Sequence, residues 1–276
     1  MRSPPPTLGP FSVVGPLVAG GSSDVLAIEY KGERAAAKCL LRELARDRRA
    51  RASFEHEATL VSRCRAKGLP TLLGREEIDE RPVIVSRWVE GAGLDIERAR
   101  SIAASVEIAR SLLRALSALH ALSDEHGPLG VVHRDVNPSN VIVGDEREVT
   151  LIDLGLASSR LFPRGADALS EGTLGYHAPE MFTGDAPIDA RADVFCAAVV
   201  VWEVIASRPL FSRSKFAAAH EIVEVDAPDV RDARGDAPEW LARALRRALA
   251  RRASERFDDA LSFERALREG LPPTRS

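Results

Sequence analysis

The amino-acid sequence predicts an α+β protein with two parts, a small antiparallel sheet with one helix and a larger, mainly helical part. Residues 11–89 hold short apolar runs separated by turn residues, a pattern typical of strands. From residue 100 onward, apolar residues recur at helical spacing over most of the chain. The glycine-containing segment 90–93 separates the two patterns, and a cleft between two such parts is a common place for a ligand.

Length and charge narrow the classes of protein that fit. A chain of 276 residues forms one large domain or two small ones. Its net charge of -3 gives no argument for binding nucleic acid or an anionic membrane. Hydrophobic residues make up 45% of the chain, too many for disorder along its whole length.

The cysteines and the longest apolar stretch favour a soluble protein of the cytoplasm. Cys39, Cys64 and Cys196 are odd in number and form no C-x-x-C pair, which is typical of free thiols in a reducing compartment. The first ten residues lack the apolar core of a signal peptide. The most apolar stretch, residues 194–206, is too short to span a bilayer and contains Glu203. We therefore expect no membrane partner.

The first part of the chain predicts five strands and one helix after a flexible lead-in at residues 1–10. Phe54, Ala58 and Val61 recur at helical spacing, whereas residues 19–24 are rich in turn residues. The predicted elements are strands at 11–17, 25–30, 34–40, 71–78 and 82–89, and a helix at 50–65.

The second part predicts helices interrupted by one pair of short strands. A long amphipathic helix is expected at residues 100–122, where leucines lie on neighbouring turns. Strands at 141–143 and 149–152 are expected to flank a charged turn. The remaining predicted helices are 194–207, 216–223, 239–252 and 258–269.

Three short motifs carry the chemistry of the chain. Residues 133–140 have the pattern H-R-D-x-x-x-x-N, residues 153–155 are D-L-G, and residues 178–180 are A-P-E. Their order and spacing resemble the catalytic loop, the D-F-G motif and the A-P-E motif of protein kinases. The sequence is thus similar to the eukaryotic-like Ser/Thr protein kinases of bacteria over nearly its whole length.

The resemblance implies a two-lobed protein-kinase-like fold over residues 11–276. The N-lobe would cover 11–86, the hinge 87–93 and the C-lobe 94–276. The implied activity is transfer of the γ-phosphoryl group of ATP to Ser or Thr hydroxyls of a protein substrate, with autophosphorylation, for which a transient homodimer is one arrangement. No nucleic acid partner is expected, and the sequence indicates neither the substrate nor the oligomeric state.

The resemblance assigns the catalytic and metal-binding roles. Asp135 would accept the proton of the substrate hydroxyl, and Asn140 and Asp153 would supply oxygen ligands for Mg²⁺, a set that also suits Mn²⁺. Lys38 would hold the phosphates; it is one of only four lysines among 38 basic residues, which favours a chemical role over a solvated one. Its implied partner is Glu57, because Phe54 stands three residues before it as in the family.

The glycine-rich loop departs from the family pattern G-x-G-x-x-G-x-V. Val18 and Ser23 stand at two of the three glycine positions, and only Gly20 remains at the middle one. Two lost glycines would weaken ATP binding or mark a degenerate site. The residues implied to bind ATP, through the loop, the adenine pocket and the hinge backbone, are Val18, Ala19, Gly20, Gly21, Val25, Ala36, Lys38, Glu57, Arg87, Val89 and Ile142.

A second departure is Asn137, which stands where Ser/Thr kinases usually have a lysine that contacts the transferred phosphate. An asparagine can donate a hydrogen bond but carries no charge. Asn137 is counted with Asp135 and Lys38 in the catalytic site, and the sequence favours an unchanged or higher rate in Asn137→Lys, by at most about tenfold. The alternative is that Asn137 makes a specific hydrogen bond that the loop requires, in which case a lysine would lower the rate sharply.

The remaining implied residues order the loops around the site. Arg134 would pair with a phosphorylated activation loop, for which Ser170 is the freer acceptor, and Thr173 would contact the catalytic aspartate. Residues 121–130 form a longer connection than the family minimum, and the sequence gives it no purpose.

Three further residues are implied to brace the larger lobe. Asp193 would hold the backbone of the catalytic loop, and Glu180 would form a buried ion pair with Arg256.

Three other functions stay open at the level of sequence. A pseudokinase, which binds nucleotide or acts as a scaffold with little transfer, fits the changes at Val18, Ser23 and Asn137. A small-molecule phosphotransferase of related fold and a plain interaction domain fit less well, because the A-P-E motif and the catalytic residues are intact.

Overall fold

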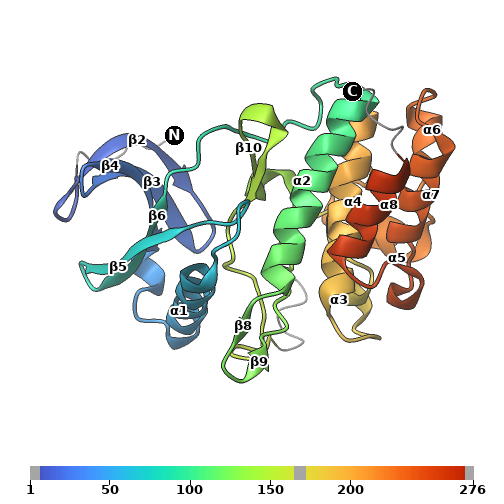
Figure 1. The fold of residues 1–276 in the computed structure, drawn as a ribbon. Coiled ribbons are helices and arrows are strands. Elements are labelled where there is room, and N and C mark those ends of the chain that lie inside the picture. The colour runs from blue at the N-terminus through green and yellow to red at the C-terminus, as the bar shows by residue number, and fades with distance from the viewer. Residues whose placement is uncertain (1–6, 165–171, 271–276) are drawn as a thin grey trace. The chain divides into compact units, whose positions relative to one another are not determined.

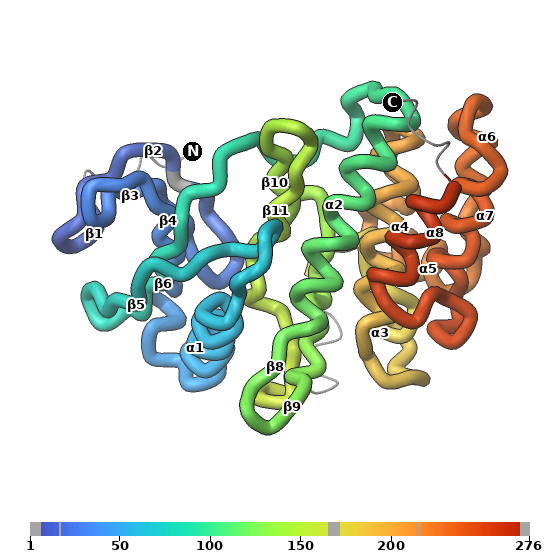
Figure 2. The backbone as a smooth tube through the Cα atoms, in the orientation of Figure 1, coloured from blue at the N-terminus to red at the C-terminus, as the bar shows by residue number. Residues whose placement is uncertain are grey.

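The computed structural model describes residues 7–164 and 172–270. The chain divides into two compact units by its internal contacts. The N-terminal unit comprises residues 1–65 and 69–90, and the C-terminal unit comprises residues 66–68 and 91–276. Figures 1 and 2 show residues 7–90 in blue to cyan and the C-terminal unit from residue 91 onward in green to red.

The N-terminal unit is built on an antiparallel sheet of strand order β1-β2-β3-β4-β6-β5. The β3–β4 and β5–β6 hairpins have positive φ at both turn residues, at Lys31 and Gly32 and again at Asp79 and Glu80, which suits the twist of the flanking strands. The strands are β1 (Thr7–Leu8), β2 (Phe11–Ala19), β3 (Ser23–Tyr30), β4 (Glu33–Leu40), β5 (Leu72–Ile78) and β6 (Arg81–Arg87).

Two strands of this sheet extend further than the sequence predicts. Thr7 and Leu8, expected in a flexible lead-in, form β1 and pair with β2, because the Leu8 side chain is buried in the core of the sheet. Strands β2 and β3 are each two residues longer at the shared turn than expected, so the loop between them consists only of Gly20–Ser22.

Helix α1 (Arg48–Arg63) packs on the sheet of its own unit. The Asp47 side chain caps its first turn by accepting a hydrogen bond from the Ala50 N–H at 2.7 Å. Phe54 and Ala58 bury their side chains against Leu40 of β4 and Ile84 of β6. This packing fixes the position of α1 relative to β4.

The C-terminal unit is mainly helical. Helix α4 (Ala190–Ala206) is buried on all sides, and α2 (Ile102–His120), α7 (Glu239–Ala248) and α8 (Ala260–Gly270) pack around it (Figure 1). The smaller helices are α3 (Glu180–Thr183), α5 (Lys215–Glu224) and α6 (Val230–Ala233). None of the described helices is both long and apolar enough to cross a membrane.

Short strands and 3-10 turns complete the C-terminal unit. Strands β7 (Ala92–Gly93), β10 (Val141–Val143) and β11 (Val149–Leu151) form a sheet of order β11-β10-β7. The connection 121–130 forms a hairpin of β8 (Ser123–Asp124) and β9 (Gly127–Pro128), which the sequence did not predict. Single 3-10 turns occur at Arg42–Leu44 in the N-terminal unit and at Pro138–Asn140, Asp145–Arg147 and Ala253–Glu255 in this one.

Candidate active site

In the N-terminal unit, β4 and α1 bring Lys38 and Glu57 together. The Lys38 Nζ lies 2.7 Å from Oε1 and 2.8 Å from Oε2 of Glu57. Both side chains are largely buried, so the ammonium group keeps a fixed position on the sheet. The pair expected from the sequence is therefore formed.

The same face of the sheet carries two of the residues implied to enclose adenine. Val25 pairs with Lys38 across β3 and β4, and Ala36 lies two residues before Lys38 on the same strand. The side chains of Val25, Ala36 and Lys38 therefore share one face. Ile142 lies on β10 of the C-terminal unit.

The β2–β3 turn explains the reduced glycine content of this loop. The Gly20 N–H donates to the Ser23 carbonyl oxygen at 2.9 Å, and a Cβ atom at Gly20 would lie only 2.6 Å from that oxygen. Val18 pairs with Val25 in the regular ladder and is 63% exposed. Ser23 is likewise a ladder residue, opposite Leu40. Only the middle position of the motif needs a glycine in this backbone.

The other residues implied for the loop and the hinge lie at or near the ends of β2 and β6. Ala19 ends β2, and a side chain at Gly21 would meet no neighbouring atom. Arg87 ends β6 and donates its N–H to the Thr71 carbonyl at 2.8 Å, and Val89 follows two residues later. The Trp88 ring between them is covered by the guanidinium of Arg34, 3.8 Å from the ring centroid.

In the C-terminal unit, the buried carboxylate of Asp193 holds the catalytic loop. It accepts the backbone N–H of His133 at 2.7 Å and of Arg134 at 2.8 Å, and His120 Nε2 lies 2.8 Å from the same carboxylate. Burial alone raises the pKa of Asp193, but the hydrogen bond and charge of His120, with His133, outweigh it and hold that pKa below its ordinary value. Arg134 adopts a positive φ of 68°, a strained conformation that these bonds sustain.

Asp135 lies at the centre of a set of hydrogen bonds that fix its carboxylate. Its Oδ1 accepts the Thr173 N–H at 2.9 Å, and its Oδ2 accepts Asn140 Nδ2 at 2.9 Å. Asn140 also donates to the Asp135 carbonyl oxygen at 2.8 Å. The catalytic loop and the segment after residue 172 therefore orient one carboxylate from two sides.

Asn137 forms a bridge that the sequence did not predict. Its Nδ2 donates to the Asp135 carbonyl at 3.1 Å and to Thr173 Oγ1 at 2.9 Å, while its Oδ1 accepts the Ser139 N–H at 2.8 Å. The side chain is only 1% exposed. Asn137 thus ties the catalytic loop to Thr173. The partners of its three hydrogen bonds can be identified only from the three-dimensional structure.

Asn140 and Asp153 supply oxygen atoms close to each other in the fold. The Ile152 N–H donates to the Asn140 carbonyl at 2.8 Å, which places Asp153 beside the end of the catalytic loop. Asp153 has a positive φ of 63°, and its Oδ1 accepts the Gly155 N–H at 3.0 Å. An amide oxygen and a carboxylate are the ligands that hard divalent cations prefer, so this donor set fits Mg²⁺.

Glu180 and Arg256 form a bidentate ion pair in the interior. Arg256 Nη1 and Nη2 each donate to one carboxylate oxygen at 2.7 Å. The other guanidinium hydrogens go to the carbonyl oxygens of Ala250, Arg191 and Arg251. The pair expected from the sequence is present, and its arginine is fully satisfied.

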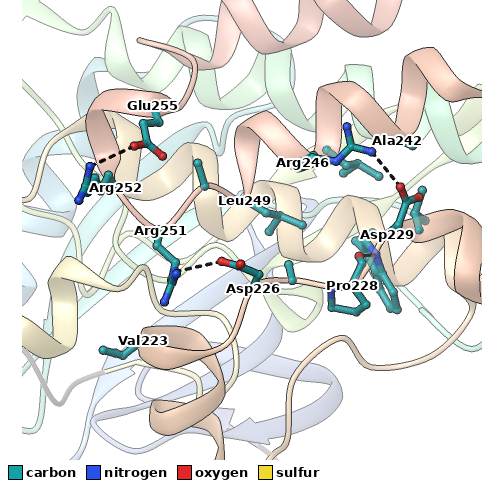
Figure 3. Close-up of a pocket in the computed structure, with 15 residues that line it drawn as sticks. Val223, Asp226, Pro228, Asp229, Ala242, Arg246, Leu249, Arg251, Arg252 and Glu255 are labelled. Carbon is teal, nitrogen blue, oxygen red and sulfur yellow. Dashed lines mark hydrogen bonds and ion pairs between the residues drawn. The ribbon is translucent and has the colours of Figure 1, made fainter.

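Ser170 lies outside the described residues. Arg134 and Glu180 line a cavity of about 380 Å³ together with Ser158, Ser159 and Arg164. A larger cavity of about 670 Å³ is lined by residues of α4 and α7 and of the segments that follow α5 and α7. Figure 3 shows the ion pairs Arg246–Asp229 and Arg251–Asp226 among its lining residues. None of the motif residues lines that larger cavity.

Comparison with known proteins agrees with this geometry. Residues 11–262 match the family described as the protein kinase domain. The probable serine/threonine-protein kinase PknB of Corynebacterium glutamicum is 30% identical over 221 residues, which are 75% of this chain and 33% of that protein. The serine/threonine-protein kinase PknL of Mycobacterium tuberculosis is 27% identical over 264 residues, 92% of this chain and 63% of that protein. The chain thus spans between a third and two thirds of these relatives.

Solved structures show the same fold. The kinase domain of Mycobacterium tuberculosis PknI superposes with a TM-score of 0.71 at 24% identity, covering 95% of this chain and 97% of that one. The expected two-lobed α+β fold is therefore confirmed. Because the family match covers most of the chain and includes every motif described above, the chain belongs to the protein kinase domain family.

Proposed function

We propose that the chain is a Ser/Thr protein kinase that transfers the γ-phosphoryl group of ATP to hydroxyls of protein acceptors, with Mg²⁺. The observation that carries the proposal is the Asp135 carboxylate, held from two sides by Thr173 and Asn140. The names of the relatives support the choice of Ser and Thr as acceptors.

Asp135 orients the acceptor hydroxyl and takes its proton. Each of its carboxylate oxygens accepts one hydrogen bond from the described residues, and a carboxylate oxygen can accept two. One lone pair therefore remains on each oxygen, and either can accept the hydroxyl of the acceptor. Because the neighbouring bonds fix the carboxylate, the hydroxyl oxygen would be aligned before the reaction begins.

Lys38, Asn140 and Asp153 bind and neutralise the phosphates. Glu57 fixes the Lys38 ammonium group, which would contact phosphate oxygens as a point charge. Asn140 uses its Nδ2 on Asp135, so its amide oxygen and the Asp153 carboxylate would hold the metal. Bound Mg²⁺ supplies charge neutralisation of the phosphates.

Transfer of label from γ-labelled ATP tests the proposal. The wild-type chain with Mg²⁺ should label itself and a library of peptides that contain a single Ser or Thr. Asp135→Asn should lose this label while its melting temperature falls by at most a few degrees, because its amide keeps the size of the carboxylate but loses one acceptor oxygen. Asp145→Asn, which changes an exposed aspartate of the same unit, is the matched control and should keep full activity.

Two outcomes would contradict the proposal. Equal labelling by Asp135→Asn would remove Asp135 from the reaction. Nucleotide binding without any labelling by the wild type would identify a pseudokinase, the alternative that Val18, Ser23 and Asn137 favour.

The proposal includes autophosphorylation in a transient homodimer, and a cytoplasmic location. An autophosphorylation rate per molecule that rises with protein concentration would support the homodimer. The free, buried cysteines support a reducing compartment, and burial raises the pKa of Cys39 and Cys64 to about 11, so these thiols resist oxidation.

A further inference from the structure

Three polar side chains outside the expected catalytic set form a cluster in the C-terminal unit. Tyr176 Oη donates to Glu203 Oε2 at 2.7 Å. Arg213 Nη2 donates to Glu203 Oε1 at 2.6 Å and to Tyr176 Oη at 2.7 Å, and its guanidinium lies 4.3 Å from the centroid of the Tyr176 ring. Glu203 is fully buried in α4, and burial raises the pKa of its carboxyl. Arg213 is thus the cation that accompanies a buried carboxylate.

The cluster contacts a tight turn at residues 173–176. The Tyr176 N–H donates to the Thr173 carbonyl at 3.2 Å, and Gly175 has a positive φ of 87°. A Cβ atom at Gly175 would collide with Arg213 Nη1. The guanidinium therefore occupies the space beside Gly175 that a side chain would need.

The opposite end of this turn contacts the catalytic loop. Thr173 donates its N–H to Asp135 Oδ1 at 2.9 Å and accepts a hydrogen bond from Asn137 at 2.9 Å. The first and last Cα atoms of such a turn are less than about 7 Å apart. A peptide whose hydroxyl reaches Asp135 must therefore pass close to the turn that Arg213 supports.

We infer that Arg213 is a positioning residue for the protein acceptor, acting through turn 173–176, an inference that rests on the proposed function. It joins the turn to α4 by two hydrogen bonds and by contact with Gly175. Arg213 lies in the loop between α4 and α5, and its side chain is 37% exposed. Burial in the core therefore does not explain why an arginine stands at position 213. A lysine would keep the charge beside Glu203 but would lose the planar group that contacts Tyr176 and Gly175 together.

Kinetics of the 276-residue Arg213→Lys chain test the inference. With the Ser/Thr peptide library as acceptor, the acceptor KM should rise roughly tenfold, because the turn is less well positioned. The KM for ATP and the slow hydrolysis of ATP without acceptor should stay within about twofold, because neither requires the turn. Arg252→Lys, which changes an exposed arginine of the same unit, is the matched control and should change none of these values.

A second variant covers a failure of Arg213→Lys to fold. Arg213→Met with Glu203→Gln removes both charges, so no unpaired carboxylate remains in the interior. This pair should show the same rise in acceptor KM. Amide hydrogen exchange at residues 173–177 should also be faster in both variants than in the wild type.

The results separate the two claims. A wild-type chain that labels no acceptor contradicts the proposed function, and the inference falls with it. An active wild type with an unchanged acceptor KM in the variants overturns the inference alone. So does an equal rise in the KM for ATP, which would indicate a structural effect on the whole site.

Discussion

Lys38 has its ammonium group between both carboxylate oxygens of Glu57, so Lys38→Ala removes two interactions at once. Transfer should fall at least a hundredfold, because the phosphates lose a fixed cation. The melting temperature should fall by a few degrees, since Glu57 is left largely buried without a partner. Phosphoryl transfer and thermal melting of the same preparation measure both effects.

Lys31→Ala is the control for this variant, because Lys31 lies at the exposed β3–β4 turn. It should retain transfer. Wild-type turnover in folded Lys38→Ala would disprove the phosphate role of Lys38.

The hydrogen bonds of Asn137 reverse the rate that the sequence alone favours for Asn137→Lys. A lysine at this position would bring charge to the phosphate, but it would also break a buried bridge of three hydrogen bonds. We therefore expect both Asn137→Lys and Asn137→Ala to lower kcat by roughly tenfold to a hundredfold, corresponding to about 1–3 kcal/mol. Steady-state kinetics with a melting curve for each variant measure the change.

Ser139→Ala is the neighbouring control, because the bridge uses only the Ser139 backbone and its side chain is exposed. A higher kcat in Asn137→Lys would show that charge outweighs the bridge.

The sequence predicts the proximity of some of these residues but not of others. The spacing within the catalytic loop and the D-L-G motif is enough to bring Asn140 and Asp153 together, because both depend on short segments of the chain. The Asn137–Thr173 bond and the Arg213–Glu203 pair join segments that meet only after folding. Asn137 is marked in the sequence as a departure from the family pattern and Glu203 as a charge within an apolar helix, but neither signal names the partner.

At the scale of elements, the β8–β9 hairpin is bonded to residues 158–160, a few residues after the D-L-G motif. Arg160 donates to Asp124 Oδ1 at 2.6 Å and, through its backbone N–H, to the Leu129 carbonyl at 2.8 Å. Val132 and Ser158 exchange two backbone hydrogen bonds beside it. The inserted connection therefore restrains residues 158–160.

Arg160→Ala should loosen this restraint without unfolding the unit. Amide exchange at Ser158 and Arg160 should become roughly tenfold faster, while the melting temperature changes little because the Arg160 side chain is partly exposed. Hydrogen-exchange mass spectrometry measures this difference. Arg147→Ala removes another exposed ion pair of the same unit and should leave those amides unchanged. Unchanged exchange in Arg160→Ala would show that the backbone bonds suffice.

The boundaries of elements show where sequence patterns are weakest. The sequence predicts a helix from 194, whereas α4 begins at Ala190 after the Asp189 cap, because polar first-turn residues hide its start. Hairpin β8–β9 and helices α3 and α6 are too short to show a period. The long helices and the five long strands carry several periods each, and the sequence predicts all of them.

At the scale of the whole molecule, the Glu180–Arg256 pair connects distant parts of the C-terminal unit. Arg256→Lys would replace five directed donors by three of a different geometry. We expect a loss of about 3–5 kcal/mol and a melting temperature lower by roughly 10 °C. Thermal denaturation followed by circular dichroism measures the shift.

Arg251→Lys is the control for that measurement, because the Arg251 side chain is partly exposed and its acidic partner, Asp226, is more so. It should change the melting temperature by no more than about 2 °C. A similar melting temperature for Arg256→Lys and the wild type would show that the pair adds little to stability.

A ribosome adds Glu180 to the growing chain 76 residues before Arg256. Until Arg256 leaves the exit tunnel, the Glu180 carboxylate has no guanidinium to pair with. Burying this carboxylate without its partner would cost free energy, so it stays in water. Final packing of the C-terminal unit therefore comes only after residue 256 has left the ribosome. A nascent chain that stalls before this point would leave α3 hydrated and open to proteases.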